Sequence, residues 1–342
     1  MLLSVLLASF LVIGCGGDEE TTTTSEESGA TETTTETEAT DAEQFPVKDI
    51  TWIVPYSPGG GFDTYSRGVA QVMSKKLGVN ILVKNVEGGG GVTGTTNIYK
   101  ADPDGYTIGI IFTPPAVQAQ VLRDAPFDVR KFTYIGKIQN GVYSLPVAAD
   151  SPYESIEDFQ QAFSSDNPIR VAATSKVNGA YASLRMLTPM DIPFTMVAGY
   201  KGSSEGLTGI IRGDAETSVN FSVASVKPFV DAGDLRVLVQ FQKERSPLLP
   251  DVPTAAELGY PEEYQYSGFE RVVVASPGIP DDVAQVLRDA FQQTMEDSEF
   301  LKWAEEAERP LSPSTAEEIR QTVEDEIVTT EQYKDRLMEY VE

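Results

Sequence analysis

Two glycine-rich turns restrict the possible folds of this chain more than any other feature of its sequence. They are residues 58–63 (PGGGFD) and 88–94 (GGGGVTG), and each lies between a β-branched run and a stretch with helical spacing. The carboxyl ends of parallel strands meet at one edge of a sheet, where open α/β sheets bind ligands. The two turns therefore predict a pocket lined by backbone atoms.

The expected ligand of this pocket is an anion. The first N–H groups of a helix have no partner within the helix, and its dipole places partial positive charge there. The formal charge of -26 would repel an anion at long range, so the binding site must be built from local N–H groups. Neither turn has the spacing of a dinucleotide-binding or Walker motif.

The remaining periodicity predicts an α/β protein with two lobes, because the alternation of strands and helices runs twice. A helix is expected to begin near Asp63 and to end before Gly78, and the tail from Asp281 is expected to be mostly helical. The other predicted helices cover residues 95–100, 155–163, 181–187, 204–212 and 225–232. The predicted strands cover residues 50–55, 80–86, 106–112, 144–149, 169–173, 195–198, 217–221, 235–241 and 271–275.

The composition excludes several kinds of site. The chain has no histidine, which removes Ser-His and Cys-His nucleophilic pairs and zinc sites that need imidazole. Its single cysteine, Cys15, rules out an internal disulfide and a thiolate metal cluster. We therefore expect neither a metal nor a cofactor. The acidity also makes nucleic acid an unfavourable partner.

The first 45 residues predict an export signal followed by a linker. Residues 2–13 are almost wholly apolar but too few to span a bilayer, which takes about 20 residues. Residues 12–15 (VIGC) resemble a bacterial lipobox, so we expect residues 1–15 to be a lipoprotein signal peptide with Cys15 lipidated. The alternative is a buried or signal-anchor segment with an incidental cysteine. Residues 16–45, acidic and rich in threonine, predict a disordered linker between the lipid and the folded part.

Asp63 has two possible roles. As a helix N-cap it would accept hydrogen bonds from the N–H groups of its own helix. As a ligand contact it would meet an amine, amide or hydroxyl of the solute. Phe62 is expected either to cover the site or to pack the helix into the core, and Arg67 either to face the pocket or to be a solvated or structural charge.

Several short motifs together resemble the substrate-binding proteins of tripartite tricarboxylate transporters. The motifs extend over most of residues 48–342, and they are 53–63 (IVPYSPGGGFD), 83–85 (VKN), 103–107 (PDGYT), 200–202 (YKG), Gly213 with Glu216, 250–254 (PDVPT) with Glu257 and Gly259, and 275–280 (ASPGIP). The resemblance implies a two-lobed, periplasmic-binding-protein-like (Venus flytrap) fold with a ligand cleft between the lobes. It implies one lobe of residues 46–144 with 268–342 and another of residues 145–267.

The resemblance also implies which residues bind the ligand. One carboxylate of the solute would be held by backbone groups and ordered water at the two turns, and the second lobe would contribute further contacts. Carried over position by position, the ligand-binding residues are Ser57, Gly60, Gly61, Phe62, Asp63, Gly89, Gly90, Gly91, Gly179, Tyr200 and Asn220. The chain departs from the family pattern around Asn178, at Gly89 and at Val92.

The function that follows is an extracytoplasmic, lipid-anchored receptor. We expect it to be a monomer that captures a small mono-, di- or tricarboxylate and delivers it to a transmembrane permease of a tripartite tricarboxylate transporter. One alternative is a sensory module that hands its closed form to a membrane sensor kinase. Another is a cell-envelope enzyme that uses paired carboxylates, with Asp63, Asp104 and Glu216 as candidates.

Overall fold

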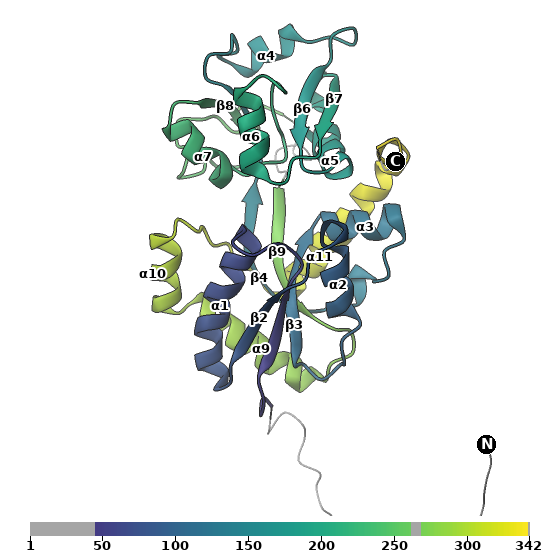
Figure 1. Ribbon diagram of the computed structural model, residues 1–342, viewed down its shortest axis with the longest axis vertical. Coiled ribbons are helices and arrows are strands. Elements are labelled where there is room, and N and C mark those ends of the chain that lie inside the picture. Colours follow the sequence, from purple (N-terminus) through teal and green to yellow (C-terminus); the bar gives the residue numbers. More distant parts are fainter. Residues whose placement is uncertain (1–44, 261–267, 341–342) are drawn as a thin grey trace, which may run out of the picture. The chain divides into compact units, whose positions relative to one another are not determined.

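The computed structural model describes residues 45–260 and 268–340 (Figure 1). The predicted signal peptide, Cys15 and all of the predicted linker except Phe45 lie outside the described residues. Every described residue belongs to one compact unit. None of the helices in this part of the chain combines the length and apolar character needed to cross a bilayer.

A five-stranded sheet organises the first set of elements (Figure 1). Its strand order is β2-β1-β3-β9-β4. The strands are β1 (Ile50–Val54), β2 (Ile81–Asn85), β3 (Thr107–Thr113), β4 (Thr133–Val142) and β9 (Gly268–Ala275). β1 pairs in parallel with β2 and β3, whereas β9 runs antiparallel between β3 and β4. The turns that follow β1 and β2 therefore lie at the same edge of the sheet.

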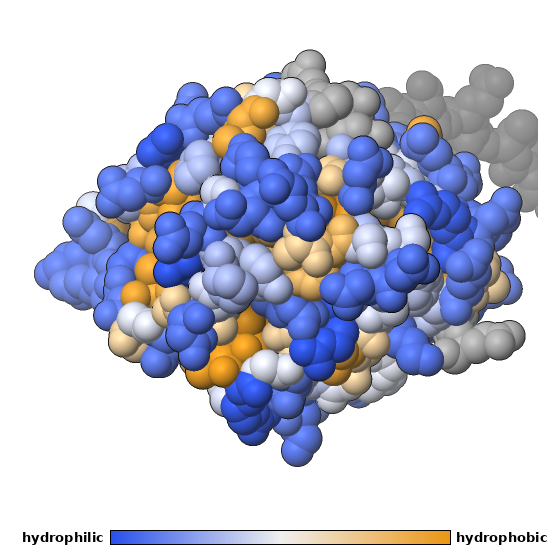
Figure 2. Space-filling model, turned by 90° about the horizontal axis from the view of Figure 1, so that it is seen from above, coloured by the Kyte–Doolittle hydropathy of each residue, from blue (hydrophilic) through white to orange (hydrophobic). Residues whose placement is uncertain are grey.

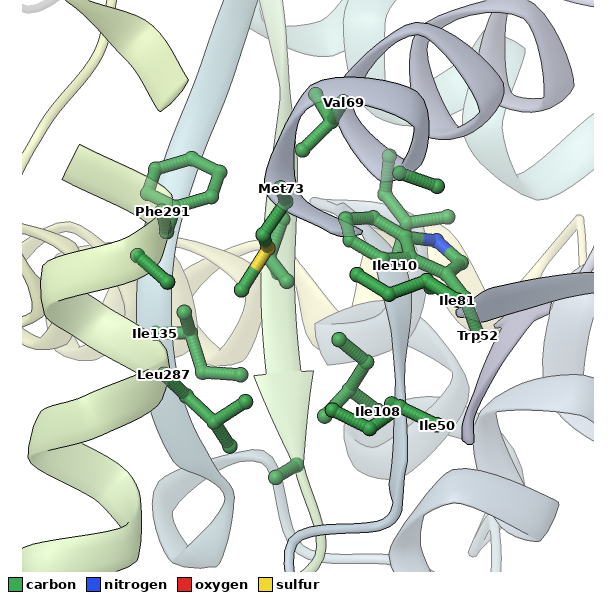
Figure 3. Packing of buried hydrophobic residues seen from close by; sticks show 14 of the residues in the cluster. Ile50, Trp52, Val69, Met73, Ile81, Ile108, Ile110, Ile135, Leu287 and Phe291 are labelled. Carbon is green, nitrogen blue, oxygen red and sulfur yellow. The ribbon is translucent and has the colours of Figure 1, made fainter. Parts of the chain in front are cut away.

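Each face of this sheet has its own hydrophobic core, because successive side chains of a strand point to opposite faces. In β1, Trp52 and Val54 pack with α1 and α9 on one face, while Ile53 packs with α2, α3 and α11 on the other. Figure 3 shows Trp52, Met73 and Phe291 converging on the first core from β1, α1 and α9. The helices of this set are α1 (Gly61–Leu77), α2 (Val92–Tyr99), α3 (Pro115–Arg123), α9 (Asp281–Met295), α10 (Ser298–Glu306), α11 (Ala316–Gln332) and α12 (Lys334–Met338).

A second set of elements is built on two small sheets. β5 (Ser144–Ala148) pairs antiparallel with β8 (Leu235–Gln240), and β6 (Ile169–Ala173) pairs in parallel with β7 (Phe194–Ala198). The helices around them are α4 (Ile156–Ala162), α5 (Lys176–Met186), α6 (Ser203–Ile211) and α7 (Val223–Asp231). The lobe boundaries between residues 144 and 145 and between residues 267 and 268 stay a prediction.

The structure corrects two expectations about local structure. α1 begins at Gly61 with Gly60 as its N-cap, so Asp63 lies in the first turn and is not the N-cap. Residues 217–221 do not form a strand, since only Thr217 makes a β-bridge, to Val171. β4 and α3 were not predicted.

Candidate functional site

A cleft of about 820 Å³ is lined by residues of both sets of elements. From the first set it includes Tyr56, Gly61 and Phe62, and from the second set Tyr200 and Asn220. The volume lies within the usual range of small-molecule sites, about 300–1,000 Å³. Figure 2 shows a surface on which hydrophilic residues predominate and apolar residues occur in separate patches.

Five helices begin at this cleft. The N-cap residues of α1, α2, α5, α6 and α7 all line it, and they are Gly60, Gly91, Ser175, Gly202 and Ser222. The three glycines make no side-chain cap. In α2 the N–H groups of Val92 and Thr93 donate to the carbonyl oxygens of Gly89 and Gly88, whereas first-turn N–H groups of α1 and α6 have no capping acceptor. Converging helix N-termini provide the local positive potential that an anion needs in a strongly acidic protein.

The first glycine turn brings the backbone against a partly buried cation, Arg271. A Cβ atom added to Gly61 would lie 2.7 Å from Nη2 of Arg271, so any larger residue would displace the guanidinium. Within the described part of the chain, the N–H groups of Gly61 and Phe62 donate no hydrogen bond. The start of α1 therefore offers free donors beside Arg271.

The second glycine turn depends on glycine for its conformation. Gly88, Gly89, Gly90 and Gly91 have φ values of 134°, 58°, 68° and 101°, a region in which other residues are strained. A Cβ atom on Gly91 would also lie 2.6 Å from the hydroxyl oxygen of Tyr56. Four consecutive residues in this conformation turn the chain sharply into α2 and expose backbone to the cleft.

Asp63 does not line the cleft, but its side chain stabilises the first glycine turn through hydrogen bonds. Its carboxylate accepts hydrogen bonds from the Gly59 N–H at 2.9 Å and from Asn85 Nδ2 at 3.0 Å, and it forms an ion pair with Arg67 at 2.9 Å. Burial raises the pKa of Asp63, but hydrogen bonds from Arg67, Gly59 and Asn85 outweigh it and hold the pKa below its usual value. The residue is buried, so these contacts determine its position.

The cleft includes eight of the eleven predicted ligand-binding residues. These are Ser57, Gly60, Gly61, Phe62, Gly90, Gly91, Tyr200 and Asn220, whereas Asp63, Gly89 and Gly179 are not among its lining residues. Gly179 instead lets α5 approach β6 closely, since a Cβ atom there would lie 2.4 Å from Cβ of Ala173. Contact of any of these residues with a ligand stays a prediction.

Asn220 is oriented by a neighbouring hydroxyl. Ser218 Oγ lies 2.8 Å from Asn220 Oδ1 and donates to it, which turns the amide so that Nδ2 is left as a donor. No partner of Nδ2 is found among the residues that the structure describes, and Asn220 lines the cleft. The second set of elements thus adds a side-chain donor opposite the glycine turns.

Arg271 is a site residue that the sequence reasoning missed. It lies on β9 in an otherwise mostly apolar run, and its guanidinium lies 4.7 Å from the ring centroid of Phe62, 4.9 Å from that of Tyr65 and 4.6 Å from that of Phe269. Nη1 donates to Gln139 Oε1. Burial lowers the pKa of Arg271 to about 10. The signal in the sequence was a charged side chain on the strand face that also carries Val273 and Ala275.

The charged side chains at the cleft are mostly basic. Lys201, Arg271 and Arg309 line it, and Glu87 is the acidic residue among its lining residues. This local excess of positive charge contrasts with the formal charge of -26 for the chain. The cleft therefore favours a negatively charged guest.

The acidic candidates for an enzymatic pair lie outside the cleft lining. Each forms an ion pair of its own: Asp63 with Arg67, Asp104 with Lys48 at 3.6 Å, and Glu216 with Arg170. In residues 45–260 and 268–340, no group of three or more acidic, histidine or cysteine side chains is placed to hold a metal ion. The described geometry thus offers binding groups and no assembled acid–base pair at the cleft.

Comparison with known proteins finds one family. The sequence profile described as "Tripartite tricarboxylate transporter family receptor" matches residues 65–334. Among curated relatives, the "UPF0065 protein in tcbD-tcbE intergenic region" of Pseudomonas sp. (strain P51) is 31% identical over 264 residues, which is 75% of this chain and 76% of the relative.

Solved structures agree with this result. A TctC solute-binding protein from Polaromonas, without ligand, matches with a TM-score of 0.70 at 20% identity, over 85% of this chain and 99% of that one. MatC (Rpa3494) from Rhodopseudomonas palustris with bound malate matches with a TM-score of 0.68 at 22% identity, over 86% of this chain and 100% of that one. These likenesses confirm the predicted two-lobed α/β fold class of periplasmic binding proteins.

Proposed function

Because the chain belongs to the tripartite tricarboxylate transporter receptor family, we propose that it captures a small carboxylate in the cleft and delivers it to a membrane permease. The members of this family are solute receptors and not enzymes. The observation that carries the proposal is the convergence of five helix N-caps and three basic side chains on one cleft. Such a site compensates an anion with aimed dipoles and local charge.

Di- and tricarboxylates are the first candidates for the solute. The three basic and one acidic lining residues leave a net positive charge that two or more carboxylates would neutralise. The R. palustris protein was solved with malate, which is a dicarboxylate. Monocarboxylates belong in the same test, because the helix N-termini bind a carboxylate whatever the rest of the solute.

Closure of the cleft would transmit the bound state to the permease. We place the moving lobes at residues 46–144 with 268–342 and at residues 145–267, with hinges near residues 142–146 and 266–270. A ligand that contacts both lobes binds the closed form more tightly and so increases its population. The protein would act as a monomer outside the cytoplasm, tethered to a membrane through lipidated Cys15.

A thermal-shift screen tests the proposal. The purified protein is heated with mono-, di- and tricarboxylates and with their amidated analogues. A ligand at about 100 times its Kd adds about 2.7 kcal/mol to the free energy of unfolding, which raises the melting temperature measurably. At least one acid should stabilise the protein while its full amide does not. A folded protein that no acid in the panel stabilises would count against solute capture.

The recipient of the closed form is tested separately. Deleting the permease genes abolishes uptake of the identified solute if the receptor serves transport. Unchanged uptake, together with loss of a solute-dependent transcriptional response when a sensor kinase is deleted, would favour the sensory alternative. Conversion of the bound solute by the purified protein would support an enzyme instead.

A further inference from the structure

Arg271 is a partly buried cation without a counter-charge in the described protein. Its Nε atom is fully buried and donates no hydrogen bond, and its Nη1 atom donates to the neutral side chain of Gln139. Across residues 45–260 and 268–340, no carboxylate forms an ion pair with it. Burial of an unpaired charge is costly, and the cost is relieved when an anion binds beside it.

The position of Arg271 identifies where that anion would lie. Nη2 is the guanidinium nitrogen closest to the start of α1, since it lies 2.7 Å from the point where a Cβ of Gly61 would be. The free N–H groups of Gly61 and Phe62 belong to the same helix start. Arg271 and these backbone donors all line the cleft, so one carboxylate could meet both.

The rings around the guanidinium hold it in place. Phe62, Tyr65 and Phe269 lie against it, and the hydrogen bond to Gln139 fixes its rotation. A guanidinium that is held before binding loses little conformational freedom when the ligand arrives. Charge-assisted hydrogen bonds from it would add to those from the backbone.

We infer that Arg271 forms a direct ion pair with the solute carboxylate that binds at the start of α1. This inference rests on the proposed function and adds to it the side chain that selects an ionised carboxylate over an ester, an amide or a neutral acid. The backbone donors alone would bind either a carboxylate or a neutral carbonyl oxygen, whereas the guanidinium favours the negative charge.

The test combines a change in the protein with a change in the ligand. Kd is measured by calorimetry for wild type, Arg271→Gln and Arg271→Lys, with the tightest acid from the panel and with each of its monoamides. We expect Arg271→Gln to raise Kd for the acid at least about 30-fold. The Kd of Arg271→Lys for the acid should lie between those of wild type and Arg271→Gln, because lysine keeps the charge but loses the planar fork of donors. For the amide at the paired carboxylate, wild type and the Gln variant should bind about equally.

Matched controls separate binding from folding. Arg130→Gln removes an exposed arginine that pairs with Glu324 and does not line the cleft, so its Kd should equal that of wild type. Circular dichroism and melting temperature report whether each variant is folded. If Arg271→Gln does not fold, Arg271→Met fills the space among the rings and is judged by the same criterion.

The possible failures are distinguishable. If wild type binds an acid and the folded Gln or Met variant binds it within about threefold, the ion pair is refuted and the proposed function stands. The ion pair is also refuted if Arg271→Gln raises the Kd of every monoamide by the same factor as it raises the Kd of the acid. If wild type binds no acid at all, the proposed function itself fails.

Discussion

Tyr181 donates its hydroxyl to the carboxylate of Glu326, and this contact joins α5 to α11. Arg185, one helical turn after Tyr181, lies 3.5 Å from the other oxygen of the same carboxylate. Leu337 of α12 and Val177 of α5 belong to one cluster of buried hydrophobic residues, which also includes Tyr181. The C-terminal helices thus contact the second set of elements through a buried polar cluster and an apolar one.

This cluster predicts a specific pH dependence. Burial is the largest influence on Glu326 and raises the pKa of its carboxyl, although Arg185 and Tyr181 lower it. A raised pKa in the folded state gives a stabilising contribution that is complete below the pKa of the unfolded chain, about 4.3, and is lost as pH rises through the folded pKa. Glu326→Gln removes this loss. Its free energy of unfolding relative to wild type should therefore increase as pH rises from 4 to the folded pKa.

Urea unfolding of wild type and Glu326→Gln at a series of pH values measures this difference. Asp231→Asn serves as a control, because Asp231 is exposed and paired within one helix with Lys227. Its difference from wild type is the reference for removing an exposed carboxylate. A constant difference for Glu326→Gln over the whole range would contradict the prediction.

Gly61→Ala should weaken carboxylate binding while leaving the fold intact. Alanine is favourable in a helix, but its Cβ would lie 2.7 Å from Nη2 of Arg271 and force the guanidinium away. We expect Kd for the bound acid to rise at least about tenfold, which corresponds to about 1.4 kcal/mol.

Gln71→Ala is the matched control for this substitution. Gln71 is an exposed residue of α1 and does not line the cleft. Calorimetry should find its Kd within about threefold of wild type. Equal losses in the two alanine variants would argue against displacement of Arg271.

Asp63→Asn should destabilise the protein by about 1–3 kcal/mol, because a buried carboxylate with several hydrogen-bond donors loses its charge. The lowered pKa of Asp63 gives stability that is present above the unfolded pKa and lost as pH falls through the folded value. The variant should therefore differ most from wild type near neutral pH and least in acid. Urea unfolding at pH 7 and pH 3 checks this, and an equal difference at both would contradict it.

Arg309→Gln should reduce the preference for multiply charged acids. Arg309 lines the cleft, and its Nε atom is buried without a hydrogen bond. Removing its charge should raise the Kd of a dicarboxylate by up to about fivefold and should raise the Kd of its half-amide less. The reason is that the attraction scales with ligand charge. The ratio of the two Kd values in wild type and variant is the measurement. A larger loss for the half-amide would contradict the assignment.

Local sequence signals were sufficient to predict the strands and helices at the sheet edge where the glycine turns lie. The β-branched runs predicted β1, β2 and β3, and the spacing of the glycines predicted that helices follow the first two. β4 was missed because it contains Gly136 and Gly141. Those glycines are explained only by distant neighbours, since a Cβ on each would lie 2.2 Å and 2.0 Å from the rings of Phe291 and Phe269.

In the cleft, too, residues held by local contacts could be predicted from the sequence, and residues held by distant contacts could not. The turns could be found because each glycine conformation is set within a few residues, whereas Arg271 meets Gly61 only after the chain has passed through the second set of elements. Asp63 was misplaced as an N-cap because Gly60 takes that position without offering a side chain. Periodicity reports the face that a strand buries but not which distant helix start it faces.

The place of the bound anion can be seen in a crystal structure of the protein with its tightest carboxylate. We predict one carboxylate in the cleft, with its oxygens within hydrogen-bond distance of the N–H groups of Gly61 or Phe62 and of Nη2 of Arg271. A solute bound elsewhere, or one whose carboxylates point away from the start of α1, would contradict the proposed receptor site.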